Sequence, residues 1–345
     1  MADPLCLAID AMGGDFGPRV TVAATLDILR QQPRLKVVLF GDSHKIQPIL
    51  DACDDTFPGR LHVQHCDQAV AMDEKPSSAL RNKRQSSMWC AVQWVAEGKA
   101  RACVSAGNTG ALMAISLYQL GALPGISRPA ICTRVPTSRG STYLLDLGAN
   151  LECSARQLYE FALMSSLAAA SPSNPKPSVG LLNIGVESIK GRQEILDAAA
   201  LLKADADINY MGFVEGDALF TGVADIVVCD GFSGNVALKT GEGVAKMIQG
   251  LLRQTLSESL LARVGALLAR PSLKRMLKKV DPAQYNGASL LGLRGVVVKS
   301  HGAASEWAFL RAIEVALGEV ERDLPTLIAG RLADKNNQSE VIDEK

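Results

Sequence analysis

Seven short segments of this 345-residue sequence combine glycine, whose backbone N–H can bind an anion, with the polar residues Asn, Ser, Thr or Asp. Each segment overlaps the end of a short apolar run. Glycine lets the backbone approach a ligand closely, and a helix that begins beyond such a turn offers free N–H groups to an anion. The segments are AIDAMGGDFGP (8–18), SAGNTGA (105–111), LLDLGAN (144–150), LLNIG (181–185), VEGD (214–217), DGFSGN (230–235) and SHGAAS (300–305).

The position that these segments share is stronger evidence for a ligand site than any one segment is. A single segment is explained by a tight turn between a strand and a helix. In open α/β sheets, however, ligands bind beyond the carboxyl ends of the strands. Seven segments in that position favour a shared site for an anionic ligand. None of them matches the P-loop or the GxGxxG motif, so a tightly bound nucleotide is not favoured.

Acidic residues accompany the glycines and would repel an anion if their carboxylates faced it. The simplest interpretation is that they accept backbone N–H bonds and orient the loops. General-base catalysis and binding of a divalent metal are the alternatives, and we predict no metal. These residues are Asp10, Asp15, Asp146, Glu215 and Asp230.

Short apolar runs alternate with longer amphipathic stretches along most of the chain. Helical periodicity is clear at 19–29, 77–96, 109–120, 157–170 and 191–202. Repeated βα units predict an α/β fold in which helices cover both faces of a mostly parallel sheet. The predicted strands are 5–9, 35–40, 60–65, 102–105, 130–135, 142–146, 179–183, 209–214, 225–229 and 296–300.

The alternation continues on both sides of the polar stretch 171–178, which we interpret as an ordered connection. We therefore expect residues 1–330 to form a single domain. The last residues are polar, and we expect 331–345 to be a flexible tail.

Residues 233–280 show helical periodicity without a strand. Proline is tolerated at the start of a helix but not in its middle, so Pro271 predicts a new helix. We expect an inserted helical hairpin at about 236–280, with its tip near 267–271. Its second half combines an apolar stripe with basic residues, which is typical of a membrane-surface or partner-docking helix. The alternative is a stripe that packs in a homodimer interface. The candidate contact residues are Arg263, Leu267, Leu268, Arg270, Lys274 and Arg275.

Composition excludes several classes of protein. The 36 Lys and Arg residues balance 36 Asp and Glu residues, which argues against a nucleic-acid-binding protein. No apolar run reaches the length of a membrane span, and the N-terminus does not resemble a secretory signal. The 8 cysteines are scattered without a CxxC pair, so we expect a reducing cytoplasm and no structural zinc.

Several of these segments, in this order, resemble motifs of the bacterial phosphate acyltransferase family. They are AIDAMGGDFGP, SAGNTGA, LDLGAN, LLNIG, DGFSGN and YNGASLLGL, and the resemblance extends over about residues 5–325. It implies a three-layer α/β/α Rossmann-like core and a homodimer. It also implies a reaction in which phosphate attacks the thioester of a fatty acyl group on acyl carrier protein. The acyl phosphate would pass to a membrane-bound glycerol-3-phosphate acyltransferase for phospholipid synthesis, by an enzyme that is cytoplasmic or peripheral at the membrane.

This reaction needs no covalent intermediate and no cofactor, because phosphate is already a nucleophile at neutral pH. The protein must hold a dianion beside the thioester and stabilise an oxyanion. We assign Asn108, Asn235 and His301 as candidate catalytic residues, His301 being the one histidine at the carboxyl end of a predicted strand. The candidate phosphate- or substrate-binding residues are Asp10, Gly13, Gly14, Asp15, Ser105, Gly107, Thr109, Asp146, Asn150, Asn183, Glu215, Asp230 and Lys239.

Other functions are kept as alternatives. A phosphotransacetylase-like enzyme would use the same chemistry. An actin-like or sugar-kinase-like enzyme is suggested by the turns DAMGGD and DLGAN, although no adenosine-binding motif accompanies them. A non-enzymatic adaptor for the carrier protein would bind it without turnover.

Overall fold

The structure is a computed structural model that describes residues 5–53, 57–279 and 281–343. Its strands form one sheet in the order β3-β2-β1-β4-β11-β10-β5-β6-β9-β7-β8. The strands are β1 Cys6–Asp10, β2 Lys36–Gly41, β3 Leu61–His65, β4 Ala102–Ser105, β5 Ala130–Thr137, β6 Gly140–Leu145, β7 Ser178–Leu182, β8 Asn209–Val214, β9 Ile226–Val228, β10 Ala288–Leu291 and β11 Val296–Lys299.

The sheet contains two parallel blocks that run in opposite directions. β3, β2, β1, β4 and β11 are parallel and form the first block. β6, β9, β7 and β8 are parallel and form the second. Between them β10 is antiparallel to β11 and β5, and β5 is antiparallel to β6. The carboxyl ends of the two blocks therefore lie at opposite edges of the sheet, so the seven segments follow strands of both directions, and the shared anion site stays a prediction.

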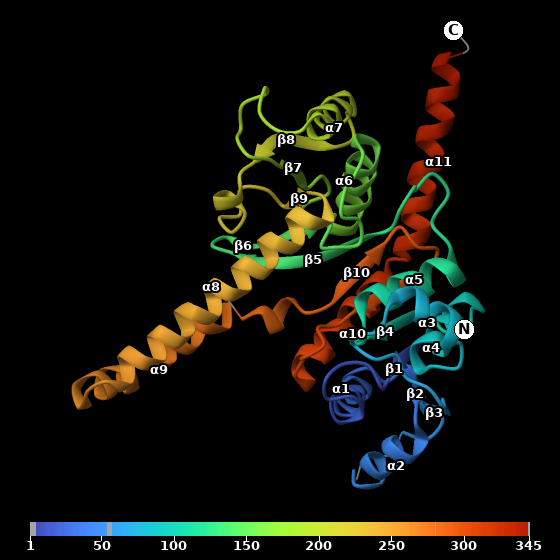
Figure 1. Ribbon diagram of the computed structural model, residues 1–345, viewed down its shortest axis with the longest axis vertical. Coiled ribbons are helices and arrows are strands. Elements are labelled where there is room, and N and C mark those ends of the chain that lie inside the picture. Colours follow the sequence, from blue (N-terminus) through green and yellow to red (C-terminus); the bar gives the residue numbers. More distant parts are fainter. Residues whose placement is uncertain (1–4, 54–56, 280, 344–345) are drawn as a thin grey trace.

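Helices cover both faces of the sheet (Figure 1), which confirms the predicted fold class. α1 and α10 pack on one face of the first block, and α4 and α5 pack on the other. α6, α7 and α11 cover the second block. The helices are α1 Pro18–Gln31, α2 Ser43–Asp51, α3 Pro76–Asn82, α4 Ser87–Ala96, α5 Thr109–Leu120, α6 Ala155–Ala169, α7 Gln193–Ala204, α8 Gly231–Ser257, α9 Leu260–Lys279, α10 Glu306–Glu321 and α11 Leu324–Asp343, with short 3-10 turns at Gly216–Ala218 and Pro282–Tyr285.

Two elements differ from the predicted ones for local reasons. The single helix expected at 77–96 is divided into α3 and α4, because the hydroxyl of Ser86 accepts the Trp89 N–H and starts a new helix. β10 was not predicted. It is only 4 residues long and lies between two glycines, Gly287 and Gly292, both of which have positive φ. Glycines this close together are typical of turns, so the sequence does not indicate a strand.

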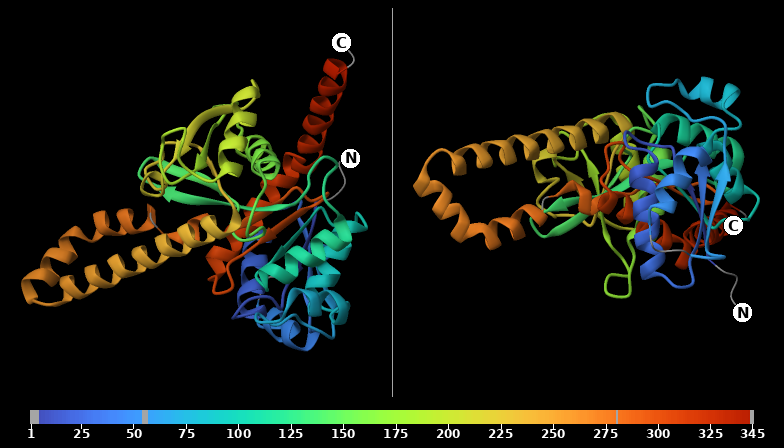
Figure 2. Two further views of the ribbon diagram at one scale, coloured as in Figure 1. Left: turned by 45° about the horizontal axis from the view of Figure 1, so that its top comes forward. Right: turned by 90° about the horizontal axis from the view of Figure 1, so that it is seen from below.

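The helical hairpin is present but turns elsewhere than expected. α8 and α9 project together from the body of the molecule (Figure 2). The chain reverses at Glu258 and Ser259, where the Ser259 hydroxyl accepts the Ala262 N–H and starts α9. Pro271 lies inside α9. The prediction of a tip near 267–271 is therefore wrong, and Leu267 and Leu268 lie along the side of the hairpin.

The C-terminal segment is helical, because α11 continues to Asp343. The flexibility of this segment stays a prediction, as does the folding of residues 1–330 as a single domain.

Candidate active site

Three loops meet at the carboxyl edge of β1, β4 and β11, and glycines allow the contact. A Cβ atom on Gly13 would lie 2.5 Å from the backbone nitrogen of Gly107. One on Gly14, whose φ is +86°, would lie 2.8 Å from the carbonyl oxygen of Gly302. The same carbonyl accepts the Asp15 N–H at 2.9 Å. We call this contact of residues 13–15, 106–107 and 302 the three-loop junction.

Asp10 fixes the floor of the three-loop junction. Its side chain is buried and accepts the hydroxyl protons of Ser87 and Ser105, both at 2.6 Å. The Ser105 oxygen in turn accepts the Gly107 N–H at 3.0 Å. Burial raises the pKa of Asp10, and these hydrogen bonds oppose the rise. The carboxylate therefore orients the loops, as the simplest interpretation of the acidic residues predicts for this residue.

Asn108 has a structural role at the start of α5. Its side-chain oxygen accepts the Ala111 N–H, and its amide donates to the carbonyls of Met72 and Glu74 at 2.8 and 2.9 Å. Both amide hydrogens are used, so this side chain has none left for an oxyanion. By helix geometry the N–H groups of Thr109 and Gly110, in the first turn, have no partner within the helix. These backbone groups are the donors that α5 offers at this edge.

His301 lies on the loop after β11 with one ring nitrogen available. Its backbone N–H donates to Asn286, and its Nδ1 accepts the Ala303 N–H at 3.1 Å. In the neutral ring the proton is therefore on Nε2. Burial and the charge of Lys239 lower the pKa of His301, so the ring is neutral at neutral pH and Nε2–H is a hydrogen-bond donor.

The second block contributes to this edge through α8. Lys239, on the third turn of α8, is exposed and forms an ion pair with Glu242 at 2.9 Å. Its charge acts on both His301 and Lys299. Lys299 ends β11 and is buried under the three-loop junction. Sequence reasoning did not select it, although a lysine that closes the apolar run VVV was a usable signal.

The predicted residues of the second block do not join the junction. Asp146 follows β6 and accepts the backbone N–H groups of Ile131, Leu147 and Asn150 at 2.7–2.9 Å. The Asn150 amide donates to the Pro129 carbonyl and to Asp146 itself. Burial raises the pKa of Asp146, and the backbone hydrogen bonds oppose this. Both side chains therefore use their hydrogen-bonding groups within the protein, on the loop after β6 and on the segment that leads into β5.

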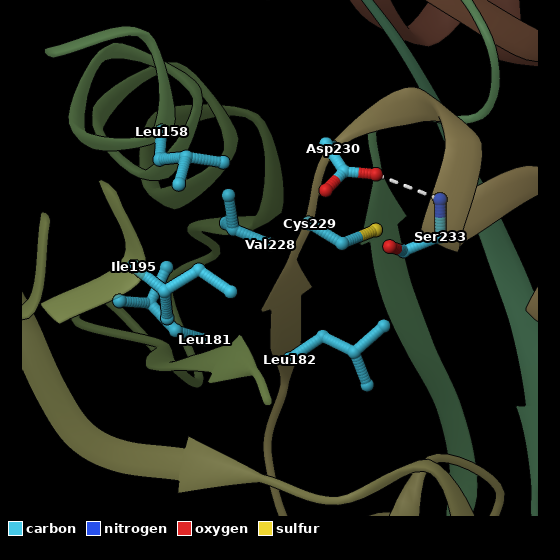
Figure 3. A pocket seen from close by; sticks show the side chains of 8 residues that line it. All are labelled: Leu158, Leu181, Leu182, Ile195, Val228, Cys229, Asp230 and Ser233. Atoms are coloured by element: carbon cyan, nitrogen blue, oxygen red, sulfur yellow. Dashed lines mark hydrogen bonds between the residues drawn. The ribbon is translucent and has the colours of Figure 1, made fainter. Parts of the chain in front are cut away.

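Asn183, Glu215 and Asp230 lie at the same far edge. The Asn183 amide donates to the carbonyls of Gly185 and Lys190, at 3.1 and 2.8 Å. Glu215 precedes a 3-10 turn. Asp230 is the N-cap of α8, accepts the Ser233 N–H at 2.7 Å and pairs with Arg192. Figure 3 shows the cavity beside Asp230, which has a volume of about 20 Å³ and has room for a water molecule but not a substrate.

Asn235 differs from the other candidate asparagines. It is exposed on α8, and its side chain makes no hydrogen bond within the described part of the chain. A Cβ atom on Gly148 would lie 3.7 Å from its amide nitrogen, so the side chain is next to the loop after β6. Of the four candidate asparagines, this is the one with amide hydrogens available to a ligand.

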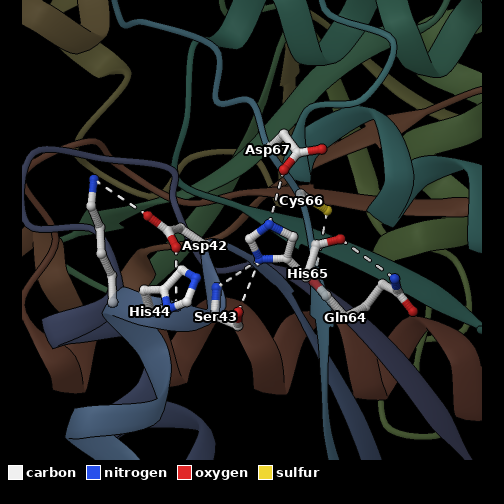
Figure 4. A network of polar contacts seen from close by, with 8 residues as sticks. Asp42, Ser43, His44, Gln64, His65, Cys66 and Asp67 are labelled. Carbon is white, nitrogen blue, oxygen red and sulfur yellow. Dashed lines mark hydrogen bonds and ion pairs between the residues drawn. The ribbon is translucent and has the colours of Figure 1, made fainter.

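A polar network lies at the carboxyl ends of β2 and β3 (Figure 4). His65 accepts the Ser43 N–H at 3.1 Å and contacts Asp67 at 3.0 Å. It thereby ties the first turn of α2 to the end of β3. Among residues 5–53, 57–279 and 281–343, no three His, Cys, Asp or Glu side chains are grouped as metal ligands.

The hairpin exposes apolar side chains over much of its length. Leu260 and Leu261 at its tip are 80% and 84% exposed, and Leu267 and Leu268 are 65% and 79% exposed. No helix in the described part of the chain is long and apolar enough to cross a membrane.

Comparison with known proteins identifies the family of this chain and relatives of its fold. A model of the family described as "Fatty acid synthesis protein" matches residues 5–327. Phosphate acyltransferases of Methylococcus capsulatus and Halorhodospira halophila are 52% and 49% identical over 329 and 333 residues, which is 95% and 96% of this chain and 97% of each relative. A phosphotransacetylase from Streptococcus pyogenes superimposes with a TM-score of 0.60 at 18% identity, over 93% of this chain and 95% of that one.

The chain therefore has an α/β fold similar to that of this phosphotransacetylase. It belongs to the phosphate acyltransferase family and is an acyltransferase, which confirms the resemblance found in its motifs. An adaptor without enzymatic activity is no longer a candidate.

Proposed function

We propose that this enzyme transfers a fatty acyl group from acyl carrier protein to inorganic phosphate. A phosphate oxygen attacks the thioester carbonyl, the tetrahedral intermediate collapses, and the carrier thiolate leaves with the pair of electrons of the C–S bond. The products are an acyl phosphate and the free carrier, whose thiolate takes up a proton. Membership of the phosphate acyltransferase family is the observation that carries this proposal.

The phosphate would bind at the three-loop junction. The N–H groups of Thr109 and Gly110 and the positive end of the α5 dipole attract an anion there. Lys239 adds an exposed positive charge from α8. Gly13, Gly14 and Gly107 allow the loops to pack closely enough to form the floor, so their contribution is to the shape of the site.

The oxyanion of the intermediate would be stabilised by His301 and Asn235. The Nε2–H of His301 and the amide of Asn235 are available donors, and removing one such donor typically costs about 3 kcal/mol of transition-state stabilisation. Asn108 is not retained as a donor, because its amide hydrogens are already bonded. Asp15 is exposed beside Gly302 and is the carboxylate best placed to accept a phosphate proton.

The hairpin would contact an anionic partner. Arg263, Arg270, Lys274 and Arg275 accompany the exposed leucines of α9, and each basic residue near an anionic membrane contributes about 1 kcal/mol. We propose that α9 meets the inner face of the cell membrane or the carrier protein. The enzyme would act as a homodimer in the cytoplasm and pass acyl phosphate to a membrane-bound glycerol-3-phosphate acyltransferase.

A direct assay tests this proposal. Purified protein is mixed with palmitoyl-carrier protein and inorganic phosphate, and acyl phosphate is detected as the hydroxamate after hydroxylamine is added. We expect product only when both substrates are present. Palmitoyl-CoA in place of the carrier is the control for donor choice. Equal or faster turnover with the CoA thioester would favour a phosphotransacetylase-like donor instead.

A further inference from the structure

Lys299 is a buried lysine without a salt bridge. Its side chain is 7% exposed, and Nζ donates to the carbonyl oxygens of Ala106, at 3.2 Å, and Ser300. Within the described residues no carboxylate lies within ion-pair distance of Nζ. Lysine is rarely buried unless it is paired, because removing an ammonium group from water is costly. A buried ammonium group without a carboxylate at ion-pair distance indicates that an anion from outside the protein binds near it.

The position of Nζ is directly under the three-loop junction. The Ala106 oxygen that it contacts lies 3.7 Å from the Cβ position of Gly14 and 3.9 Å from that of Gly302. β11 runs parallel to β4 with Lys299 opposite Ser105, so the side chain starts between two of the three loops. An ammonium group has three N–H donors, and two are used. Within the described residues the third has no hydrogen-bond acceptor.

Charges of both signs act on Lys299. Asp10 on β1 and Asp15 on the next loop favour its protonated form, whereas Lys239 on α8 opposes it. Burial outweighs the two carboxylates and lowers the pKa of Lys299 to about 8. A dianion bound at the junction would favour the ammonium form.

We propose that Lys299 is the positioning residue of the phosphate site, an inference that rests on the proposed function. Its ammonium group holds the Ala106 carbonyl, and with it the loop that leads to Gly107 and α5. It also places a positive charge beneath the bound dianion. A purely structural lysine would hold the loop equally well but would leave phosphate affinity and proton uptake unchanged.

Phosphate binding to the purified full chain tests this role, with inorganic phosphate as the probe in calorimetry. Lys299→Met should weaken phosphate binding by roughly tenfold or more, as the loss of a charged interaction predicts. The matched control is Lys176→Met. Lys176 also donates to a backbone carbonyl, that of Ala206 at 2.6 Å, but far from the junction. Its loss should leave the affinity for phosphate unchanged.

Proton uptake in the unmodified enzyme gives an independent readout if Lys299→Met does not fold. At about pH 8.5 free phosphate is already the dianion and Lys299 is partly neutral, so binding should take up protons from the buffer. His301→Gln should keep this uptake. No uptake by the unmodified enzyme, or equal phosphate affinity in a folded Lys299→Met protein, would overturn the inference.

These outcomes are separate from failure of the proposed function. An enzyme that binds phosphate in a Lys299-dependent way but forms no acyl phosphate from palmitoyl-carrier protein would contradict the proposed donor and leave the role of Lys299 intact. An enzyme that forms acyl phosphate while Lys299→Met binds phosphate normally would contradict the role of Lys299 alone.

Discussion

The two edges of the sheet carry similar glycine-rich segments but use their polar groups differently. At the edge of β6, β7 and β9, the Asp146 carboxylate and the amides of Asn150 and Asn183 are bonded to groups of their own loop or of the neighbouring segment before β5. At the edge of β1, β4 and β11, the ring of His301 and the first turn of α5 keep donors available. A buried cation, Lys299, also lies under that junction. We infer from this difference that donors without partners, together with a buried cation, indicate a binding site better than glycine alone does.

Replacing His301 should have the largest effect on turnover. If Nε2–H stabilises the oxyanion, His301→Ala should lower kcat by about 10²–10³-fold with little change in thermal stability. The measurement is acyl phosphate formation at saturating phosphate. His62→Ala is the matched control, because His62 is exposed on β3, away from the junction, and should be neutral. A similar loss of kcat in both variants would contradict a specific catalytic role for His301.

Replacing Asn150 should affect stability and leave chemistry unchanged. Asn150→Ala removes donors from the Pro129 carbonyl and from the buried Asp146 carboxylate, which should cost about 1–3 kcal/mol of unfolding free energy. Chemical denaturation measures this cost. The kcat of the folded fraction should match that of the unmodified enzyme. A large fall in kcat with unchanged stability would place the far edge in the active site.

Replacing the exposed leucines of α9 should have the smallest effect on soluble turnover. Leu267→Glu combined with Leu268→Glu should weaken binding to vesicles that contain anionic lipid, because apolar area is lost and negative charge is added. Ile184→Glu with Ile189→Glu is the control, since these side chains are 79% and 87% exposed on the second block. Dissociation of a dimer with unchanged vesicle binding would show that the leucines form a subunit interface.

The sequence predicted correctly those helices and strands whose pattern lies within a few neighbouring residues. The run ACVS and the stretch 209–214 form β4 and β8 at the predicted bounds, and α5 has the bounds predicted from its helical periodicity. β10 was missed because a strand of 4 residues between glycines has no periodicity to detect. The hairpin turns at Ser259, whose hydroxyl caps α9, whereas Pro271 lies inside α9. A prediction based on Pro271 alone therefore misplaces the tip.

The assembly of the site was harder to predict because it depends on contacts distant in sequence. Reversal of the second block follows from the antiparallel pairing of β10 with β5 and of β5 with β6, which no short motif specifies. The engagement of Asn108 depends on carbonyls at 72 and 74, about 35 positions away. Asp10 and the three glycines could be selected from sequence, whereas the burial of Lys299 required the structure.

The central claim is that phosphate binds at the three-loop junction and not at the far edge. A crystal structure of the enzyme with inorganic phosphate and the free carrier thiol tests it most directly. We expect the phosphate oxygens to accept the N–H groups of Thr109 and Gly110, with Nε2 of His301 facing the space left for the thioester. Phosphate bound beside Asp146, Asn150 and Asp230, with the junction empty, would contradict the account.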